Sequence, residues 1–116
     1  MRTSSLKLNP SLRSQLNKSL FQTIADLKDE SEVETFLSDF LNESELETFV
    51  KRIAVAYWLK KGRSYSYIKN NLKVSSATIA SIQESLNKPG IRLALKKLEA
   101  EEWANVWSEK IKKFVR

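Results

Sequence analysis

Five uncharged side chains, each polar or small, that can contact DNA bases lie close together in the sequence. They are Ser76, Ala77, Thr78, Ser81 and Gln83. The hydroxyls and the amide can donate to or accept from base edges, and the methyl groups of alanine and threonine can pack on thymine. A helix that enters the major groove needs little bulk at its leading end and side chains of this kind. We therefore interpret these residues as candidates for reading bases.

Acidic and basic side chains are concentrated in separate stretches of the sequence before and around this segment. Residues 31–50 carry six acidic side chains and no basic one, whereas residues 51–75 carry seven basic side chains and no acidic one. The basic block flanks and enters the base-reading segment, where the phosphates of a bound duplex would lie. The candidates for phosphate binding are Arg52, Lys60, Lys61, Arg63, Lys69 and Lys73, with the hydroxyls of Tyr65 and Ser75. The alternative for each cation is a solvated surface without a partner.

The spacing of apolar residues predicts that two short helices joined by a tight turn carry the base-reading residues, over residues 64–86. The apolar positions are Ile68 and Leu72 in the first helix, and Ile79, Ile82 and Leu86 in the second. They recur every three or four residues, so each helix has one narrow apolar stripe. Such stripes suit two helices that pack on each other and on a scaffold, which leaves most of the second helix exposed.

Serines mark the start of both short helices. Ser64 and Ser75 are placed to cap them, since a serine hydroxyl accepts hydrogen bonds from the free N–H groups of a first turn. Lys73 and Val74 form the turn between the helices. The position of Lys73 often requires a left-handed backbone, which glycine adopts most readily, so we expect a cost on the order of 1 kcal/mol there.

Three longer amphipathic helices, residues 10–28, 31–41 and 44–60, are predicted ahead of this pair. Their starts are marked by Asn9 with Pro10, by a capping box of Ser31 and Glu34, and by a capping box of Ser44 and Glu47. Gly62 is expected to close the third helix. After residues 87–90 a further helical segment begins. The shift of its apolar stripe between Leu98 and Trp103 predicts a kink, a split, or contacts with different surfaces.

Composition narrows the class of protein. The chain has 116 residues, a net charge of +6, two glycines, two prolines, and neither cysteine nor histidine. We therefore expect one all-α domain without disulfides, metal or cofactor, and no enzyme, because no nucleophile–base pair, metal cluster or phosphate loop is present. No apolar run approaches a membrane span and the start lacks the core of a secretory signal, so we expect a soluble, cytoplasmic protein that binds no membrane.

The helical pattern also suggests how the chain is organised. We expect a flexible tail at residues 1–8, a helical domain at 9–87 and a C-terminal helical extension at 88–116. The three long helices present more apolar surface than one small core can use, which predicts a homodimer.

From Leu20 to Asn87 the sequence resembles the tryptophan-repressor superfamily, and in particular its YerC/YecD-like branch. The resemblance is carried by the segments LFQTIADLKDESEVETFLSDFL, WLKKGRSYSYI and NNLKVSSATIASIQESL. It implies an all-helical, intertwined homodimer whose paired helix-turn-helix units bind operator DNA. In the repressor, the leading end of the recognition helix reads bases, and the matching positions are Ser76, Ala77 and Thr78.

Two departures from the repressor bear on its amino-acid corepressor. The resemblance implies that two arginines hold this ligand beside a glycine. Arg52 matches the first arginine, but the second falls on Ser81 and the glycine on Ile82. Serine cannot make the forked, charge-assisted contact of an arginine, and isoleucine takes up the space of an indole. A small-molecule effector is therefore not expected.

The leading hypothesis is a repressor-like, sequence-specific transcriptional regulator that binds double-stranded DNA as a homodimer. The alternative is a helical adaptor in which a vestigial helix-turn-helix holds protein partners and the basic face is incidental. Salt dependence separates the two, because only phosphate binding releases counterions in proportion to the contacts made.

Overall fold

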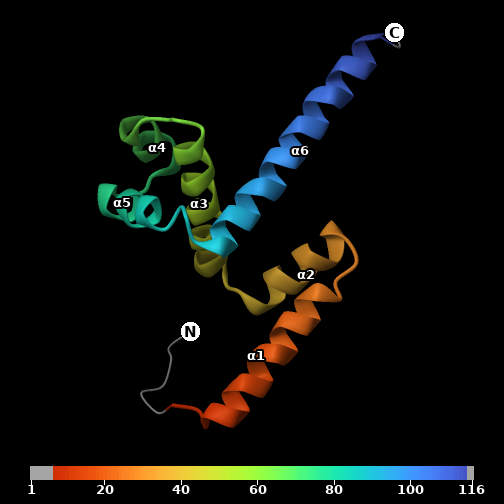
Figure 1. Ribbon diagram of the computed structural model, residues 1–116, viewed down its shortest axis with the longest axis vertical. Helices are drawn as coiled ribbons and strands as arrows, with labels where there is room; N and C mark the ends of the chain where they lie inside the picture. Colours follow the sequence, from red (N-terminus) through yellow and green to blue (C-terminus); the bar gives the residue numbers. More distant parts are fainter. Residues whose placement is uncertain (1–6, 115–116) are drawn as a thin grey trace. The chain divides into compact units, whose positions relative to one another are not determined.

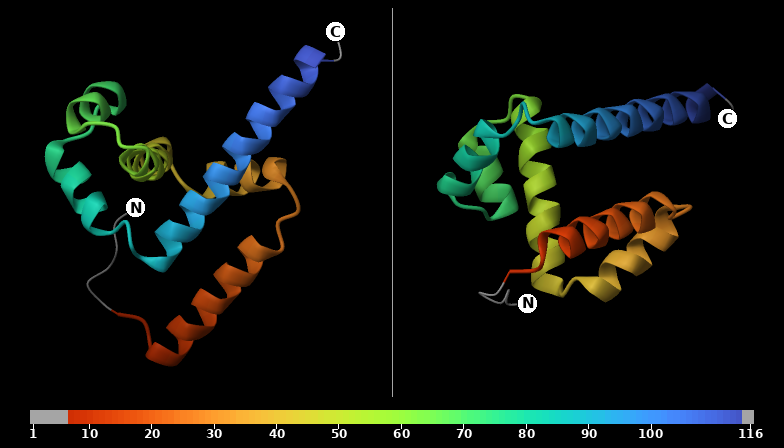
Figure 2. Two further views of the ribbon diagram at one scale, coloured as in Figure 1. Left: turned by 45° about the horizontal axis from the view of Figure 1, so that its top comes forward. Right: turned by 60° about the horizontal axis from the view of Figure 1, so that its bottom comes forward.

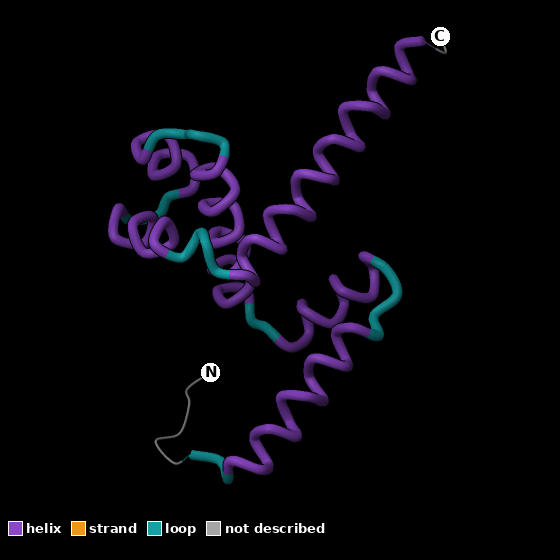
Figure 3. Tube along the Cα trace, in the orientation of Figure 1, coloured by secondary structure: helices purple, strands orange, loops and turns teal. Residues whose placement is uncertain are grey.

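A computed structural model describes the backbone of residues 7–114 and the side chains of residues 7–102. Every element in this part of the chain is a helix, which confirms the all-α prediction (Figure 1 and Figure 3). The helices are α1 (Pro10–Ala25), α2 (Glu30–Phe40), α3 (Glu43–Lys60), α4 (Tyr65–Leu72), α5 (Ser76–Glu84) and α6 (Pro89–Phe114). The predicted tail at residues 1–8 lies outside the described residues except for its last two positions.

The chain forms two compact units, Met1–Glu43 with α1 and α2, and Ser44–Arg116 with almost all of α3 and with α4 to α6. In the first unit α1 begins as predicted, because the Asn9 side chain accepts hydrogen bonds from the N–H groups of Ser11, at 2.9 Å, and Leu12, at 3.3 Å. The helix ends at Ala25, ahead of the predicted end near Lys28.

The predicted cap of α2 was wrong by two residues. Asp29 rather than Ser31 is the cap, and its carboxylate accepts from the N–H of Glu32 at 3.0 Å. Glu32 in turn accepts from the N–H of Lys28, the residue before the cap, at 3.0 Å, so the contact resembles a capping box shifted by one residue. A capping residue followed three positions later by glutamate occurs twice here, as Asp29 with Glu32 and as Ser31 with Glu34. The helix uses the earlier pair, whose capping residue is charged.

The predicted cap of α3 was also placed too late. The helix begins at Glu43, so Ser44 lies in its first turn. Asparagine caps helices about as well as serine, and Asn42 immediately precedes the first helical residue.

The apolar stripe of α1 is exposed along its whole length. Its leucines Leu12, Leu16 and Leu20 are each between 45% and 49% exposed, and Phe21 is 65% exposed. No side chain of α1 or α2 is buried. The unit of α1 and α2 therefore has an apolar face that other described residues leave exposed. The sequence predicted more apolar surface than one small core can bury.

In the part of the second unit whose side chains are described, the buried side chains are Val55, Ala56, Ile68, Ile79 and Leu95, and three of them form one packed cluster. Val55 of α3, Ile68 of α4 and Ile79 of α5 are all 0% exposed and pack together. Partly buried side chains surround them, namely Trp58, Leu59, Leu72, Val74 and Ile82. This arrangement confirms that the narrow stripes of α4 and α5 face each other and a scaffold helix.

The end of α3 has the hydrogen bonds of a Schellman motif. The N–H of Gly62 donates to the carbonyl of Leu59 and the N–H of Arg63 to that of Trp58, both at 3.0 Å. Gly62 has φ of 81°, a left-handed backbone that glycine adopts without steric cost. The predicted closure of the third helix at this glycine is confirmed.

The turn between α4 and α5 also follows the sequence prediction. Ser64 accepts from the N–H of Tyr67 and Ser75 from that of Thr78, each at 3.1 Å. Lys73 ends α4 with φ of 55° and ψ of 50°, the left-handed conformation expected there. The two short helices with their tight turn are visible in both views of Figure 2.

α6 begins at Pro89, inside the break predicted at residues 87–90, and runs without interruption to Phe114. The apolar shift near Leu98 therefore does not split it (Figure 2). The side chain of Trp103, on which that expectation also rested, lies outside the described side chains. Among the described residues, no helix combines the length and the apolar character needed to cross a bilayer.

Candidate nucleic-acid interface

The first turn of α5 is exposed and held by its cap. Ser76 and Ala77 are exposed, and Thr78 is half-buried. Besides accepting from the N–H of Thr78, the Ser75 hydroxyl lies 3.0 Å from that of Thr78. A hydroxyl can donate one hydrogen bond and accept two, so Thr78 keeps capacity for a further contact. The cap therefore orients a threonine that was expected to read bases.

Gln83 and Tyr65 form a second contact among the predicted residues. The Tyr65 hydroxyl donates to the side-chain carbonyl of Gln83, which links the start of α4 to the far end of α5. Both side chains remain exposed. The contact leaves the two amide hydrogens of Gln83 free to donate. A residue expected to bind phosphate thus orients one expected to read bases.

Arg63 is placed by both its backbone and its side chain. Its N–H closes the Schellman motif, and its guanidinium carbon lies 5.3 Å from the centre of the Tyr67 ring. The centres of the Tyr67 and Trp58 rings are 5.1 Å apart. A cation over an aromatic face is attracted by the ring quadrupole. Sequence reasoning missed Tyr67, whose only signal was an aromatic residue four positions after an arginine.

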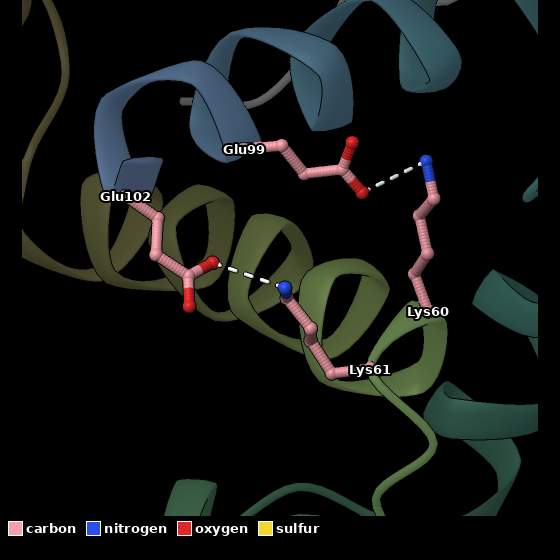
Figure 4. Close-up of polar contacts among 4 residues, drawn as sticks. All are labelled: Lys60, Lys61, Glu99 and Glu102. Atoms are coloured by element: carbon pink, nitrogen blue, oxygen red, sulfur yellow. Dashed lines mark ion pairs between the residues drawn. The ribbon is translucent and has the colours of Figure 1, made fainter. Parts of the chain in front are cut away.

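Lys60 and Lys61, at the end of α3, are paired with carboxylates of α6. Lys60 Nζ lies 3.0 Å from Glu99 Oε1, and Lys61 Nζ lies 3.1 Å from Glu102 Oε2 (Figure 4). Lys61 also lies over the ring of Tyr57, at 5.5 Å from its centre. No pattern in the sequence pointed to these partners, because about forty residues separate each lysine from its carboxylate.

The remaining cations expected to bind phosphate are exposed and lie in two places. Lys69 is in the last turn of α4, and Lys73 is its C-cap. Neither has an ion pair with any residue that the structure describes. Arg52 lies elsewhere, at the wall of a groove formed by α3, α5 and the start of α6. The structure therefore groups Arg63, Lys69 and Lys73 with the helix-turn-helix and Arg52 with the groove.

The groove has a volume of about 970 Å³ and mostly apolar walls. Three residues expected to read bases, Ala77, Thr78 and Ser81, lie along it, whereas Ser76 and Gln83 do not. Ile82 and Lys88 also line it. Isoleucine leaves the groove open, so the expected lack of a corepressor rests chiefly on the missing second arginine. Lys88 adds a second cation, but an ammonium is a point charge and lacks the fork of a guanidinium.

Comparison with known proteins gives concordant results. The family described as Trp repressor protein matches residues 15–99. An uncharacterized protein, YerC of Bacillus subtilis, is 32% identical over 76 residues, which cover 66% of this chain and 73% of that protein. The crystal structure of a TrpR-like protein from Eubacterium eligens matches with a TM-score of 0.70 and 32% identity, over 78% of this chain and 96% of the other.

Proposed function

The chain belongs to the Trp repressor protein family, and from this premise we propose that it is a sequence-specific, DNA-binding regulator of transcription that acts as a homodimer. The observation that carries the proposal is the first turn of α5, which is capped by Ser75, carries no charged side chain and exposes Ser76 and Ala77. The cations of Arg63, Lys69 and Lys73 flank it. In this proposal α5 enters the major groove and the flanking cations hold the phosphates.

The homodimer is supported by the apolar stripe of α1. Leucine side chains that are about half exposed along a whole helix are rarely left in water, because each gains free energy from burial against another chain. In a two-fold dimer the two copies of α5 would be about 34 Å apart, one turn of B-DNA. The operator would then be roughly palindromic, with half-sites one turn apart.

The direct test is a selection of preferred sites from random duplex DNA, followed by binding measurements on a preferred and a random duplex over a range of salt. A reader of DNA should lose affinity steeply, with a log–log slope near −0.9 per phosphate contacted. Binding that is absent, or that hardly responds to salt, would contradict the proposal and favour the adaptor alternative.

A matched pair of variants separates base reading from phosphate binding. Thr78→Ala removes a candidate base contact and no charge, so it should weaken the preferred duplex by about 1–3 kcal/mol and the random duplex little. Arg63→Ala should weaken both duplexes alike and reduce the salt slope by about 1. If both variants behave identically on the two duplexes, the assignment of roles to α5 and its flanks is wrong.

We propose further that DNA binding does not depend on tryptophan. A single arginine in the groove, Arg52, cannot replace the pair that the family resemblance implies, and Ser81 offers no charge. L-tryptophan at millimolar concentration should therefore change the affinity for a preferred duplex less than tenfold. The variant Ser81→Arg restores the missing arginine beside Arg52 and should gain a tryptophan response. A tenfold response of the unaltered chain would overturn this part of the proposal.

A further inference from the structure

Lys60 and Lys61, at the end of α3, form ion pairs with carboxylates of the same chain, which are anionic oxygen groups like the phosphates of DNA. Glu99 and Glu102 are three residues apart, so their side chains leave the same face of α6. The lysines are consecutive and immediately precede Gly62 and Arg63, which lead into the helix-turn-helix. A carboxylate and a phosphate oxygen compete for the same ammonium group. Each carboxylate takes up one of the three N–H donors and offsets the positive charge of its lysine, so the pair weakens the attraction of that lysine for a phosphate.

We propose that Glu99 and Glu102 limit DNA affinity by occupying Lys60 and Lys61 in competition with the phosphates. This inference rests on the proposed function and adds to it a regulatory role for α6. The two carboxylates act as an internal substitute for the backbone of a duplex. They lower the sequence-independent part of the affinity, which comes from phosphate contacts.

The exposure of the pairs indicates that the competition is reversible. The four side chains are between 39% and 49% exposed, so solvent and salt weaken both pairs. Two exposed pairs of this kind correspond to about a 2–10-fold change in affinity rather than to an all-or-none block. A duplex can displace the carboxylates, because it presents one negative charge per about 1.7 Å of its axis.

The test uses the full-length chain and three variants that each remove one carboxylate from α6: Glu99→Gln, Glu102→Gln and Glu101→Gln. Glu101 is the matched control, because it is exposed on another side of α6 and has no ion pair with a described residue. Binding to a random duplex is measured from low to high salt. Glu99→Gln and Glu102→Gln should each raise affinity about 2–5-fold at low salt and steepen the log–log slope by up to about 0.9.

A second background shows whether the effect passes through the lysine. In chains that carry Lys60→Gln, the further change Glu99→Gln should raise affinity no more than Glu101→Gln does. Thermal unfolding of each variant, followed by circular dichroism, shows that the fold is retained. If Glu99→Gln, Glu102→Gln and the Glu101→Gln control all give the same gain, the carboxylates act only through net charge and the inference is wrong.

The outcomes also separate this inference from the proposed function. If the unaltered chain binds neither a preferred nor a random duplex, and the two glutamine variants do not either, the proposed function fails. If the unaltered chain binds with a steep salt slope but Glu99→Gln and Glu102→Gln match the control, the proposed function stands and the competition by α6 is excluded.

Discussion

Lys73 ends α4 with a left-handed backbone that costs a non-glycine residue about 1–2 kcal/mol. We predict that Lys73→Gly raises the free energy of unfolding by about 1 kcal/mol, since glycine adopts this conformation without steric strain. The measurement is chemical unfolding at fixed chain concentration. Lys69→Gly, the same substitution inside α4, serves as the control.

The control should change in the opposite direction, because glycine within a helix lowers stability by about 1 kcal/mol. Equal changes in the two variants would contradict the structural reading of the turn. Lys73→Gly should at the same time reduce the salt slope of DNA binding by about 1 if this lysine contacts a phosphate. A phosphate contact of this kind would explain why a lysine with a strained backbone, and not a more stable glycine, occupies position 73.

Tyr67 holds the guanidinium of Arg63 over its ring and is itself packed on Trp58. We predict that Tyr67→Leu weakens DNA binding about 2–5-fold, the effect of one exposed cation–π contact. The loss should be equal on a preferred and a random duplex. Tyr67→Phe keeps the ring and should bind like the unaltered chain. A loss with phenylalanine as large as that with leucine would show that the ring does not position Arg63.

At the scale of elements, the start of α2 shows how two candidate caps compete. Asp29 accepts from the N–H of Glu32, Glu32 accepts from the N–H of Lys28, and Ser31 lies inside the helix. We predict that Asp29→Ala lowers the free energy of unfolding by about 1 kcal/mol, while Ser31→Ala changes it by less than about 0.5 kcal/mol. Chemical unfolding of the two variants compares them directly. A larger loss of unfolding free energy with Ser31→Ala than with Asp29→Ala would show that Ser31, and not Asp29, caps the helix.

Local signals accounted for most of the fold and little of the site. Caps such as Ser64 and Ser75, the stop at Gly62 and the stripes that begin at Ile68 and Ile79 depend on residues within one or two turns, so they could be predicted. The Glu99 and Glu102 partners depend on how α6 crosses α3, which no local spacing encodes. The contacts of Tyr67 and Gln83 required knowing which faces of α4 and α5 meet.

At the scale of the whole molecule, the exposed leucines of α1 predict a dimer in solution. Light scattering at micromolar chain concentration should give about twice the monomer mass of 13.4 kDa. Leu16→Glu places a charge in the middle of the stripe and should shift the mass toward that of the monomer. The control is Lys18→Glu, which changes a charged residue of the same helix outside the apolar stripe and should leave the dimer intact. A monomeric mass for the unaltered chain would contradict the prediction.

The triple contact of Val55, Ile68 and Ile79 has a consequence for hydrogen exchange. The N–H groups of Ile68 and Ile79 donate to the carbonyls of Ser64 and Ser75 at 3.1 and 3.2 Å, in the first turns of helices that would fray in isolation. Their side chains are 0% exposed, so neither amide can open unless the contact itself separates. Both amides should therefore exchange with the same protection as that of Val55, and α3, α4 and α5 should open to solvent as a single cooperative unit.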